Sequence, residues 1–181
     1  MVEPQEKCEV RPVAELTAAE QSALRALSRA VYPPEIPLPG RAIEWAAPQW
    51  SVITWDAGGE ALCHVGVFLR EARWNGRAVK VGGIGGVKTH PASRRRGLAS
   101  AAIQRALAFL REQGEVDFAL LVCAPGLVPF YERLGWHRFP GDLLVTQKGT
   151  IGPFTFNLPM TIPLRLRESL SGTIDLLGPP W

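Results

Sequence analysis

VKTHPASRRRGLA, residues 87–99, joins the end of an extended segment, a short turn and the first residues of a helix. The first main-chain N–H groups of a helix have no partner within it, and the helix dipole places partial positive charge there. Such a terminus binds anions, and Gly97 lets a phosphate approach the main chain closely. Arg94, Arg95 and Arg96 add charged hydrogen-bond donors. This stretch therefore predicts a pyrophosphate site.

Two other interpretations of the three arginines remain open at this point. Adjacent arginines commonly form a solvated surface, and a basic patch also serves nucleic-acid binding. A nucleic-acid site would favour interleaved aromatic residues or a second basic cluster, and the sequence has neither. The sequence also lacks the lysine–serine pair of nucleoside-triphosphate loops and the three glycines of dinucleotide-binding folds. We therefore expect a diphosphate ligand of another class and no nucleic-acid partner.

Length and composition indicate an ordinary globular protein. The chain has 181 residues, 46% hydrophobic and 20% charged, with a formal net charge of +3. We expect a single domain over residues 1–181 that buries a sizeable core. The N-terminal ten residues carry charges in place of an apolar signal-peptide core, and no segment has the roughly 18 apolar residues of a membrane span. The three cysteines show no disulfide or zinc spacing, so we expect a cytoplasmic protein without a metal or a membrane partner.

Hydrophobic periodicity and turn residues predict an α+β fold. Thr17 and Glu20 have the spacing of a helix capping box, and Asn75-Gly76 is a strong hairpin signal. The proline-rich residues 32–40 cannot continue a helix, and they form either a connection or a wall of a site. Predicted strands cover residues 8–13, 50–55, 61–72, 77–89, 118–123 and a late segment at 154–158. Predicted helices cover residues 17–29, 98–110 and 127–134.

Two motifs resemble the GCN5-related N-acetyltransferase (GNAT) superfamily. The sequence RRRGLA at 94–99 is similar to the family's Q/R-x-x-G-x-G/A pyrophosphate loop, and PFYERLGW at 129–136 resembles its F-Y-x-x-x-G-F/W segment. The predicted strand 118–123 separates them in the family's order. The resemblance implies the GNAT fold, an α/β sandwich whose mixed, mostly antiparallel sheet has a splayed central strand pair and flanking helices. It also implies acetyl-coenzyme A as co-substrate and no metal.

The resemblance assigns roles to individual residues. An N–H near Val87 would stabilise the oxyanion of the tetrahedral intermediate, and Tyr131 would protonate the departing coenzyme A thiolate. A buried core aromatic is the alternative interpretation of Tyr131. Ala124 stands where the family often has an asparagine that contacts the pantetheine. The implied cofactor-binding residues are Val87, Lys88, Thr89, Arg94, Arg95, Arg96, Gly97, Leu98 and Ala99.

Within the superfamily, residues 50–181 most resemble the aminoglycoside 2'-N-acetyltransferases. Those enzymes place a glutamate where this chain has Gly85, and that carboxylate helps to hold the substrate amine. Glu44 and the terminal carboxylate of Trp181 are among the possible replacements, and His90 is either a general base or a solvent-facing residue. The expected acceptor is a primary amine of a small molecule, with aminoglycosides as a candidate. The expected substrate-binding residues are Glu35, Gly85, Gly86, Asp175 and Trp181.

Two further expectations concern activity and assembly. The leading hypothesis is an N-acetyltransferase that uses direct attack by the amine, so Cys123 is expected to be a buried strand residue rather than a nucleophile. The alternative is a catalytically silent acyl-coenzyme A-binding module that acts as a sensor or partner domain. Late strands of this fold often pair between subunits, so we also expect a homodimer.

Overall fold

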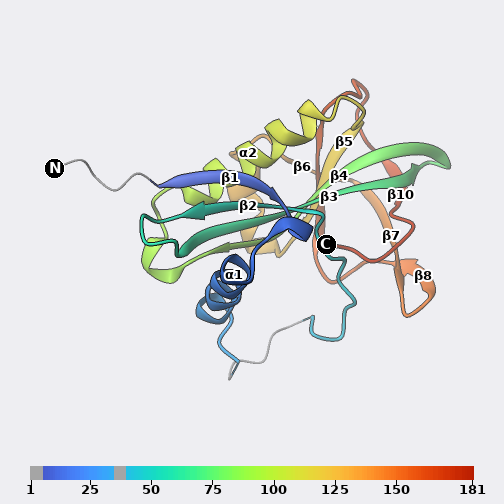
Figure 1. Cartoon of the computed structure of the whole chain (residues 1–181). Helices are drawn as coiled ribbons and strands as arrows, with labels where there is room; N and C mark the ends of the chain where they lie inside the picture. The colour runs from blue at the N-terminus through green and yellow to red at the C-terminus, as the bar shows by residue number, and fades with distance from the viewer. Residues whose placement is uncertain (1–5, 35–39) are drawn as a thin grey trace.

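In the computed structural model, which describes residues 6–34 and 40–181, one mixed sheet of ten strands runs through the described residues (Figure 1). Its main path is β6-β9-β5-β4-β3-β10-β7-β8, with β2 beside β3 and β1 beside β2. Helices α1 and α2 lie on opposite faces of the sheet (Figure 1). The strands are β1 Lys7–Pro12, β2 Trp50–Trp55, β3 Ala61–Trp74, β4 Arg77–Thr89, β5 Phe118–Cys123, β6 His137–Arg138, β7 Gly141–Gln147, β8 Thr150–Pro153, β9 Leu158–Pro163 and β10 Gly172–Asp175.

The three α-helices are α1 Ala18–Val31, α2 Leu98–Glu112 and α3 Val128–Glu132. The predicted capping box is confirmed, because the Thr17 hydroxyl accepts from the Glu20 N–H and the Glu20 carboxylate accepts from the Thr17 N–H. These two bonds satisfy N–H groups that would otherwise lack partners at the start of α1. No helix among the described residues is long and apolar enough to cross a membrane.

The long β3–β4 hairpin organises the sheet. Asn75 and Gly76 turn it with φ values of 50° and 80°, the left-handed conformation that this tight turn needs. Toward the other end of the hairpin the pairing shifts: Gly66 is opposite Gly85, but His64 is opposite Lys88. Residues 86 and 87 of β4 therefore oppose a single residue of β3, which is a β-bulge.

The predicted splayed strand pair is β4 and β5. These strands pair in parallel from Val81 opposite Phe118 to Gly83 opposite Leu120. Beyond that point β4 continues beside β3, and β5 continues beside β9 as far as Cys123. The two strands thus separate toward their C-terminal ends, which confirms the expected GNAT architecture.

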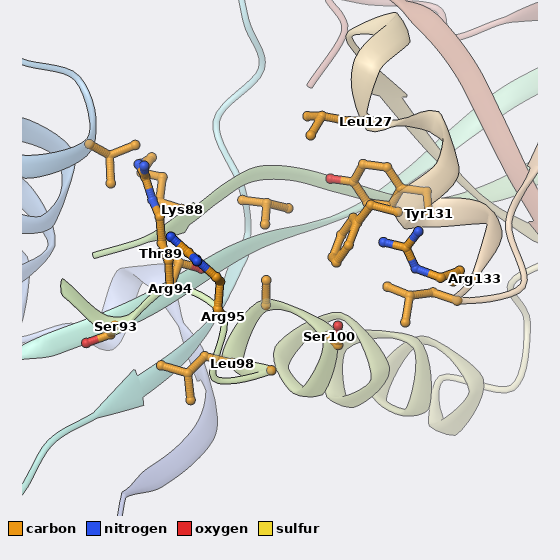
Figure 2. A pocket seen from close by; sticks show the side chains of 16 residues that line it. Lys88, Thr89, Ser93, Arg94, Arg95, Leu98, Ser100, Leu127, Tyr131 and Arg133 are labelled. Atoms are coloured by element: carbon orange, nitrogen blue, oxygen red, sulfur yellow. The ribbon is translucent and has the colours of Figure 1, made fainter. Parts of the chain in front are cut away.

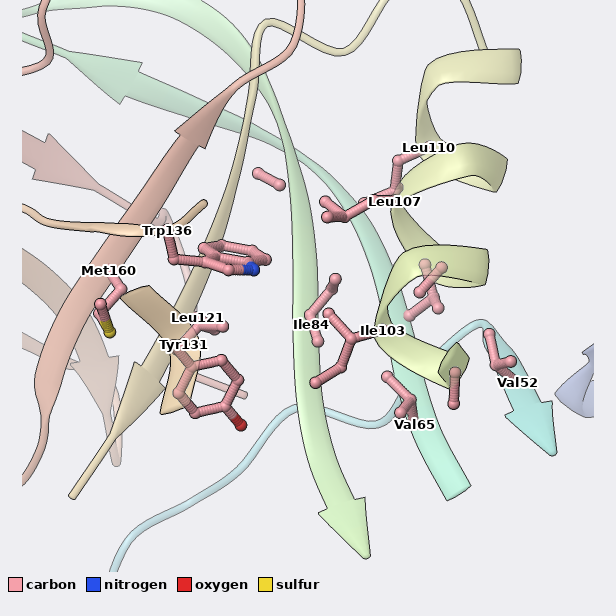
Figure 3. Close-up of a cluster of buried hydrophobic side chains, with 14 of the residues drawn as sticks. Val52, Val65, Ile84, Ile103, Leu107, Leu110, Leu121, Tyr131, Trp136 and Met160 are labelled. Carbon is pink, nitrogen blue, oxygen red and sulfur yellow. The ribbon is translucent and has the colours of Figure 1, made fainter. Parts of the chain in front are cut away.

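The main core lies between α2 and the sheet. Figure 3 shows Ile103, Leu107 and Leu110 of α2 on one side of β4, with Trp136 and Leu121 on the other side. All five side chains are almost completely removed from solvent. Burying each aliphatic side chain contributes about 1.5–3 kcal/mol, so this layer holds α2 firmly against the splayed strands.

The prediction of a late strand at 154–158 is wrong. β8 ends at Pro153 and β9 begins at Leu158, so most of the predicted strand is the connection between them. Its apolar alternation reflects an aromatic cluster rather than a sheet face, because Phe154 and Phe156 both make edge-on contacts with Trp45. The helix predicted at 127–134 is also shorter, since a 3-10 turn over Pro125–Leu127 precedes α3.

Candidate active site

A cavity of about 730 Å³ opens where β4 and β5 separate (Figure 2). Its walls come from the end of β4, the start of α2, the end of α1 and the α3 region. Among the described residues, its lining contains four cationic side chains and no carboxylate. A cavity with this charge favours an anionic ligand. The cationic residues are Lys88, Arg94, Arg95 and Arg133, and the other lining residues are Val31, Val87, Thr89, Ser93, Gly97, Leu98, Ala99, Ser100, Leu127, Phe130, Tyr131 and Leu134.

The start of α2 forms one part of the cavity wall. Gly97 is the N-cap residue with φ 79°, and a Cβ placed there would meet nothing within 4 Å. Arg95 also has a left-handed φ, 62°, so the main chain curls just before the helix. No side chain of the described residues caps this terminus, and its N–H groups remain available to a ligand. The local geometry supports the diphosphate site expected from the sequence.

The three consecutive arginines have different surroundings. Arg94 and Arg95 line the cavity, whereas Arg96 is outside the lining and its guanidinium pairs with the Glu6 carboxylate. Lys88 is partly buried, and its Nζ donates to the Ser28 hydroxyl of α1 over 3.1 Å. Burial lowers the pKa of the Lys88 ammonium from its usual value.

Tyr131 belongs to the core and also lines the cavity, so the structure confirms the core aromatic and leaves the acid role a prediction. Its ring packs edge-on against Phe130 and Trp136, and the residue is 6% exposed. Its hydroxyl points into the cavity (Figure 2). Burial, with smaller effects from Cys123 and Tyr32, raises the pKa of Tyr131 well above its usual range. The hydroxyl therefore stays protonated at neutral pH and can donate a proton or a hydrogen bond.

His64 is a buried residue whose contacts the sequence did not reveal. Its Nδ1 is 3.0 Å from the carbonyl oxygen of Gly86, and its Nε2 is 3.1 Å from the hydroxyl of Ser51. Burial and the neighbouring Lys88 ammonium lower the pKa of His64 to about 4. The ring is neutral at pH 7. A neutral ring that meets a carbonyl must donate from Nδ1, and it then accepts from Ser51 at Nε2.

Gly85 and Trp181 are adjacent in space. A Cβ on Gly85 would lie 2.8 Å from the main-chain carboxyl carbon of Trp181, which leaves no room for a side chain. The Trp181 indole stacks on Phe68 with ring centroids 5.2 Å apart, and its Nε1 donates to the Leu120 carbonyl over 3.0 Å. The space next to Gly85 is thus occupied by the last residue of the sequence. Neither Gly85 nor Trp181 lines the cavity, and substrate binding by them stays a prediction.

The remaining candidate residues lie elsewhere. The Asp175 carboxylate accepts from the Leu177 N–H, and β10 meets β3 at its turn end, far along the strand from His64. Glu44 accepts from the Lys148 N–H in the β7–β8 turn. Glu35 lies outside the described residues. Neither of the two described acids lines the cavity. Asp175 holds a local turn, and Glu44 contacts a turn that is distant in the sequence.

Two other residues have local structural contacts. Nδ1 of His90 accepts from the Ala92 N–H, so its ring caps the 3-10 turn over Pro91–Ser93 rather than lining the cavity. The Cys123 thiol lies 3.5 Å from the Met160 sulfur, and burial raises the pKa of the thiol to about 11. A thiol that stays protonated is a poor nucleophile, as the sequence analysis expected for this strand residue.

Transfer of an acyl group from a diphosphate-bearing thioester requires an anion site at one end and a proton donor at the other. This cavity offers both, at α2 and at Tyr131, and this arrangement fits an acyl-coenzyme A-dependent transferase. Residues 12–139 match the family model described as "Acetyltransferase (GNAT) domain". The chain belongs to the GNAT family and is an acetyl-coenzyme A-dependent acetyltransferase.

Solved structures share this fold at low sequence identity. YhbS from Escherichia coli, solved in complex with CoA, is 17% identical with a TM-score of 0.62, and the match covers 98% of this chain and 93% of that one. ElaA from Escherichia coli is 16% identical with a TM-score of 0.63, over 87% and 99% of the two chains. A GNAT acetyltransferase from Brucella melitensis, in complex with acetyl-CoA, is 21% identical with a TM-score of 0.53, over 72% and 83%. No curated protein matches the sequence significantly.

Proposed function

We propose that the protein transfers the acetyl group of acetyl-coenzyme A to a primary amine of a small molecule. One observation carries the proposal: the start of α2 and the Tyr131 hydroxyl face the same cavity from different elements. The first suits the diphosphate, and the second suits the sulfur of the thioester. The end of β4 also contributes to the cavity wall, through Val87 and Thr89.

The proposed reaction is direct. A neutral amine attacks the thioester carbonyl carbon, a C–N bond forms, and the carbonyl oxygen gains negative charge that the Val87 N–H stabilises. The C–S bond then breaks, and Tyr131 donates its proton to the departing thiolate. The new amide nitrogen loses its extra proton to water. The thiols of Cys63 and Cys123 are buried and burial raises their pKa values, so they are poor nucleophiles. The proposed reaction therefore has no acyl-enzyme intermediate on these cysteines.

The finer proposal for the acceptor is an aminoglycoside, and it rests on sequence likeness. A polycationic acceptor would favour several carboxylates around one site. The Asp175 and Glu44 carboxylates accept hydrogen bonds from the main chain at Leu177 and Lys148, and Gly85 offers no carboxylate. The acceptor panel should therefore include aminoglycosides beside singly charged amines such as alkylamines and amino-acid amides.

Release of free coenzyme A thiol tests the proposal directly. Purified protein with acetyl-coenzyme A and each amine should release thiol at a rate that saturates with the accepted amine, and mass spectrometry should show the acetylated amine. Saturable coenzyme A binding without thiol release across the panel would favour the alternative, a silent acyl-coenzyme A-binding module. The absence of coenzyme A binding would contradict both.

We also propose a homodimer in the cytoplasm. The edge strand β8 and the exposed side chains of Ile151 and Phe156 support a surface that a second copy would cover. Light scattering at several protein concentrations tests the mass, and a strictly monomeric mass would contradict the proposal. Free Cys8, Cys63 and Cys123 agree with a reducing compartment.

A further inference from the structure

We infer that His64 is a positioning residue for the acetyl-transfer step, because it fixes the direction of the Gly86–Val87 peptide and thereby aims the Val87 N–H into the cavity. The inference rests on the proposed function, which gives that N–H its role at the thioester oxygen. His64 is on β3 and is not among the residues that line the cavity. Its effect is transmitted through one peptide group.

The peptide group between Gly86 and Val87 lies in the bulge of β4. In this bulge two residues of β4 oppose one residue of β3, so the regular ladder does not determine where their N–H and C=O groups point. Gly86 has φ 57°, a left-handed conformation that favours glycine. The direction of this peptide therefore depends on another contact.

His64 supplies that contact. Its Nδ1 donates to the Gly86 carbonyl over 3.0 Å from the β3 side. In a planar trans peptide the N–H points opposite to the C=O. When the Gly86 carbonyl points toward the His64 ring, the Val87 N–H points away from that ring. β5 is the neighbour of β4 opposite β3, and the cavity opens where β5 diverges. Val87 itself lines the cavity.

The ring of His64 is well held for this task. The Ser51 hydroxyl lies 3.1 Å from Nε2, so the two ring nitrogens contact two different strands. The residue is 8% exposed and neutral at pH 7, which keeps Nδ1–H as the donor and Nε2 as the acceptor. A donor on the Gly86 carbonyl also polarises the peptide and strengthens its N–H as a donor.

Three substitutions of His64 distinguish a role in orienting the Gly86–Val87 peptide from a role in filling space. His64→Asn keeps an N–H donor at the place of Nδ1, His64→Leu has the shape of asparagine without a donor, and His64→Gln moves the donor outward. Loss of one oxyanion donor typically lowers kcat about 100-fold or more. We expect that loss in the His64→Leu and His64→Gln variants, with coenzyme A affinity unchanged. The His64→Asn variant should recover most of the turnover.

The outcomes distinguish this inference from the proposed function. If wild-type protein turns over and the His64→Leu variant folds, binds coenzyme A and keeps full kcat, the inference is overturned. If the His64→Leu variant does not fold, equal turnover of the His64→Asn and His64→Gln variants overturns it. Failure of the wild-type protein to bind coenzyme A or to release thiol contradicts the proposed function instead.

Nuclear magnetic resonance gives a readout that needs no activity. The Gly86 carbonyl carbon and Val87 amide resonances should move when the donor is removed in His64→Leu and return toward their wild-type positions in His64→Asn. Unchanged resonances in a folded His64→Leu variant would show that this hydrogen bond does not orient the peptide.

Discussion

Tyr131 packs edge-on against Trp136, with ring centroids 6.4 Å apart, while its hydroxyl faces the cavity. The same residue therefore packs in the core through its ring and presents its oxygen to the cavity. Tyr131→Phe keeps the ring and removes the oxygen. We expect kcat to fall about 10²- to 10⁴-fold, as for loss of a general acid, with little change in coenzyme A affinity or thermal stability. Steady-state kinetics and calorimetry check this, and full activity in the variant would exclude the acid role.

Gly97 tests the anion site at the start of α2. A Cβ at Gly97 would meet no atom within 4 Å, but the left-handed φ of 79° is strained for a residue such as valine. Gly97→Val should block close approach of the diphosphate to the main chain. Gly114→Val is the matched control, because Gly114 has φ 72° and open space at the other end of the same helix. Calorimetry should show coenzyme A binding lost in the first variant and retained in the second. Equal coenzyme A affinities of the two variants would contradict a diphosphate site at the start of α2.

The three arginines should not contribute equally to binding. Arg94 and Arg95 line the cavity, and a charge-assisted hydrogen bond contributes about 1.5–3 kcal/mol, so Arg94→Ala or Arg95→Ala should weaken coenzyme A binding by about tenfold or more. Arg96 pairs with Glu6 outside the lining, and Arg96→Ala should leave the affinity within about twofold because an exposed ion pair contributes little. Titrations at two salt concentrations check the ranking. A larger loss of coenzyme A affinity in Arg96→Ala than in Arg94→Ala and Arg95→Ala would contradict this ranking.

Burial of neutral His64 makes the stability of the fold depend on pH. Its pKa falls from 6.5 to about 4 on folding. Between these two pH values His64 is protonated in the unfolded chain and neutral in the folded protein. Above pH 6.5 both states are neutral, and His64 adds no pH dependence. Between pH 6.5 and 4 stability should fall with acidification, by up to about 3 kcal/mol from this group. Urea unfolding of the wild-type and His64→Asn proteins checks this, and identical pH profiles would contradict it.

Trp181 should stabilise the sheet. It is 5% exposed, stacks on Phe68 and donates to the Leu120 carbonyl. Trp181→Ala should cost about 3–5 kcal/mol of unfolding free energy, the usual cost of removing a buried tryptophan. Trp45→Ala is the control, because Trp45 is 40% exposed and should cost much less. Comparable losses in the two variants would show that the Trp181 contacts add little.

Much of the fold followed from local sequence patterns. The bounds of β2, β4 and β5 agree with the predicted strands, and the capping box at Thr17 and the turn at Asn75-Gly76 formed as expected. Each of these signals acts over a few residues, through hydrogen bonds or φ values that neighbouring side chains favour. The prediction of a late strand at 154–158 was wrong because Phe154 and Phe156 pack against Trp45. Trp45 lies more than a hundred residues earlier in the chain, and the alternation of these aromatics resembles that of a sheet face.

The sequence by itself determined that a helix begins directly after the arginines at 94–96, because a helix terminus and its flanking residues are set by local backbone chemistry. It also placed Tyr131 downstream of that terminus. Tertiary structure decided what these residues face. It turned Arg96 to Glu6, brought His64 of β3 to the Gly86 carbonyl of β4, and placed Trp181 against Gly85. These contacts join segments that are distant in the chain. Strand pairing, bulge geometry and core packing fix them, and no local pattern encodes those features on its own.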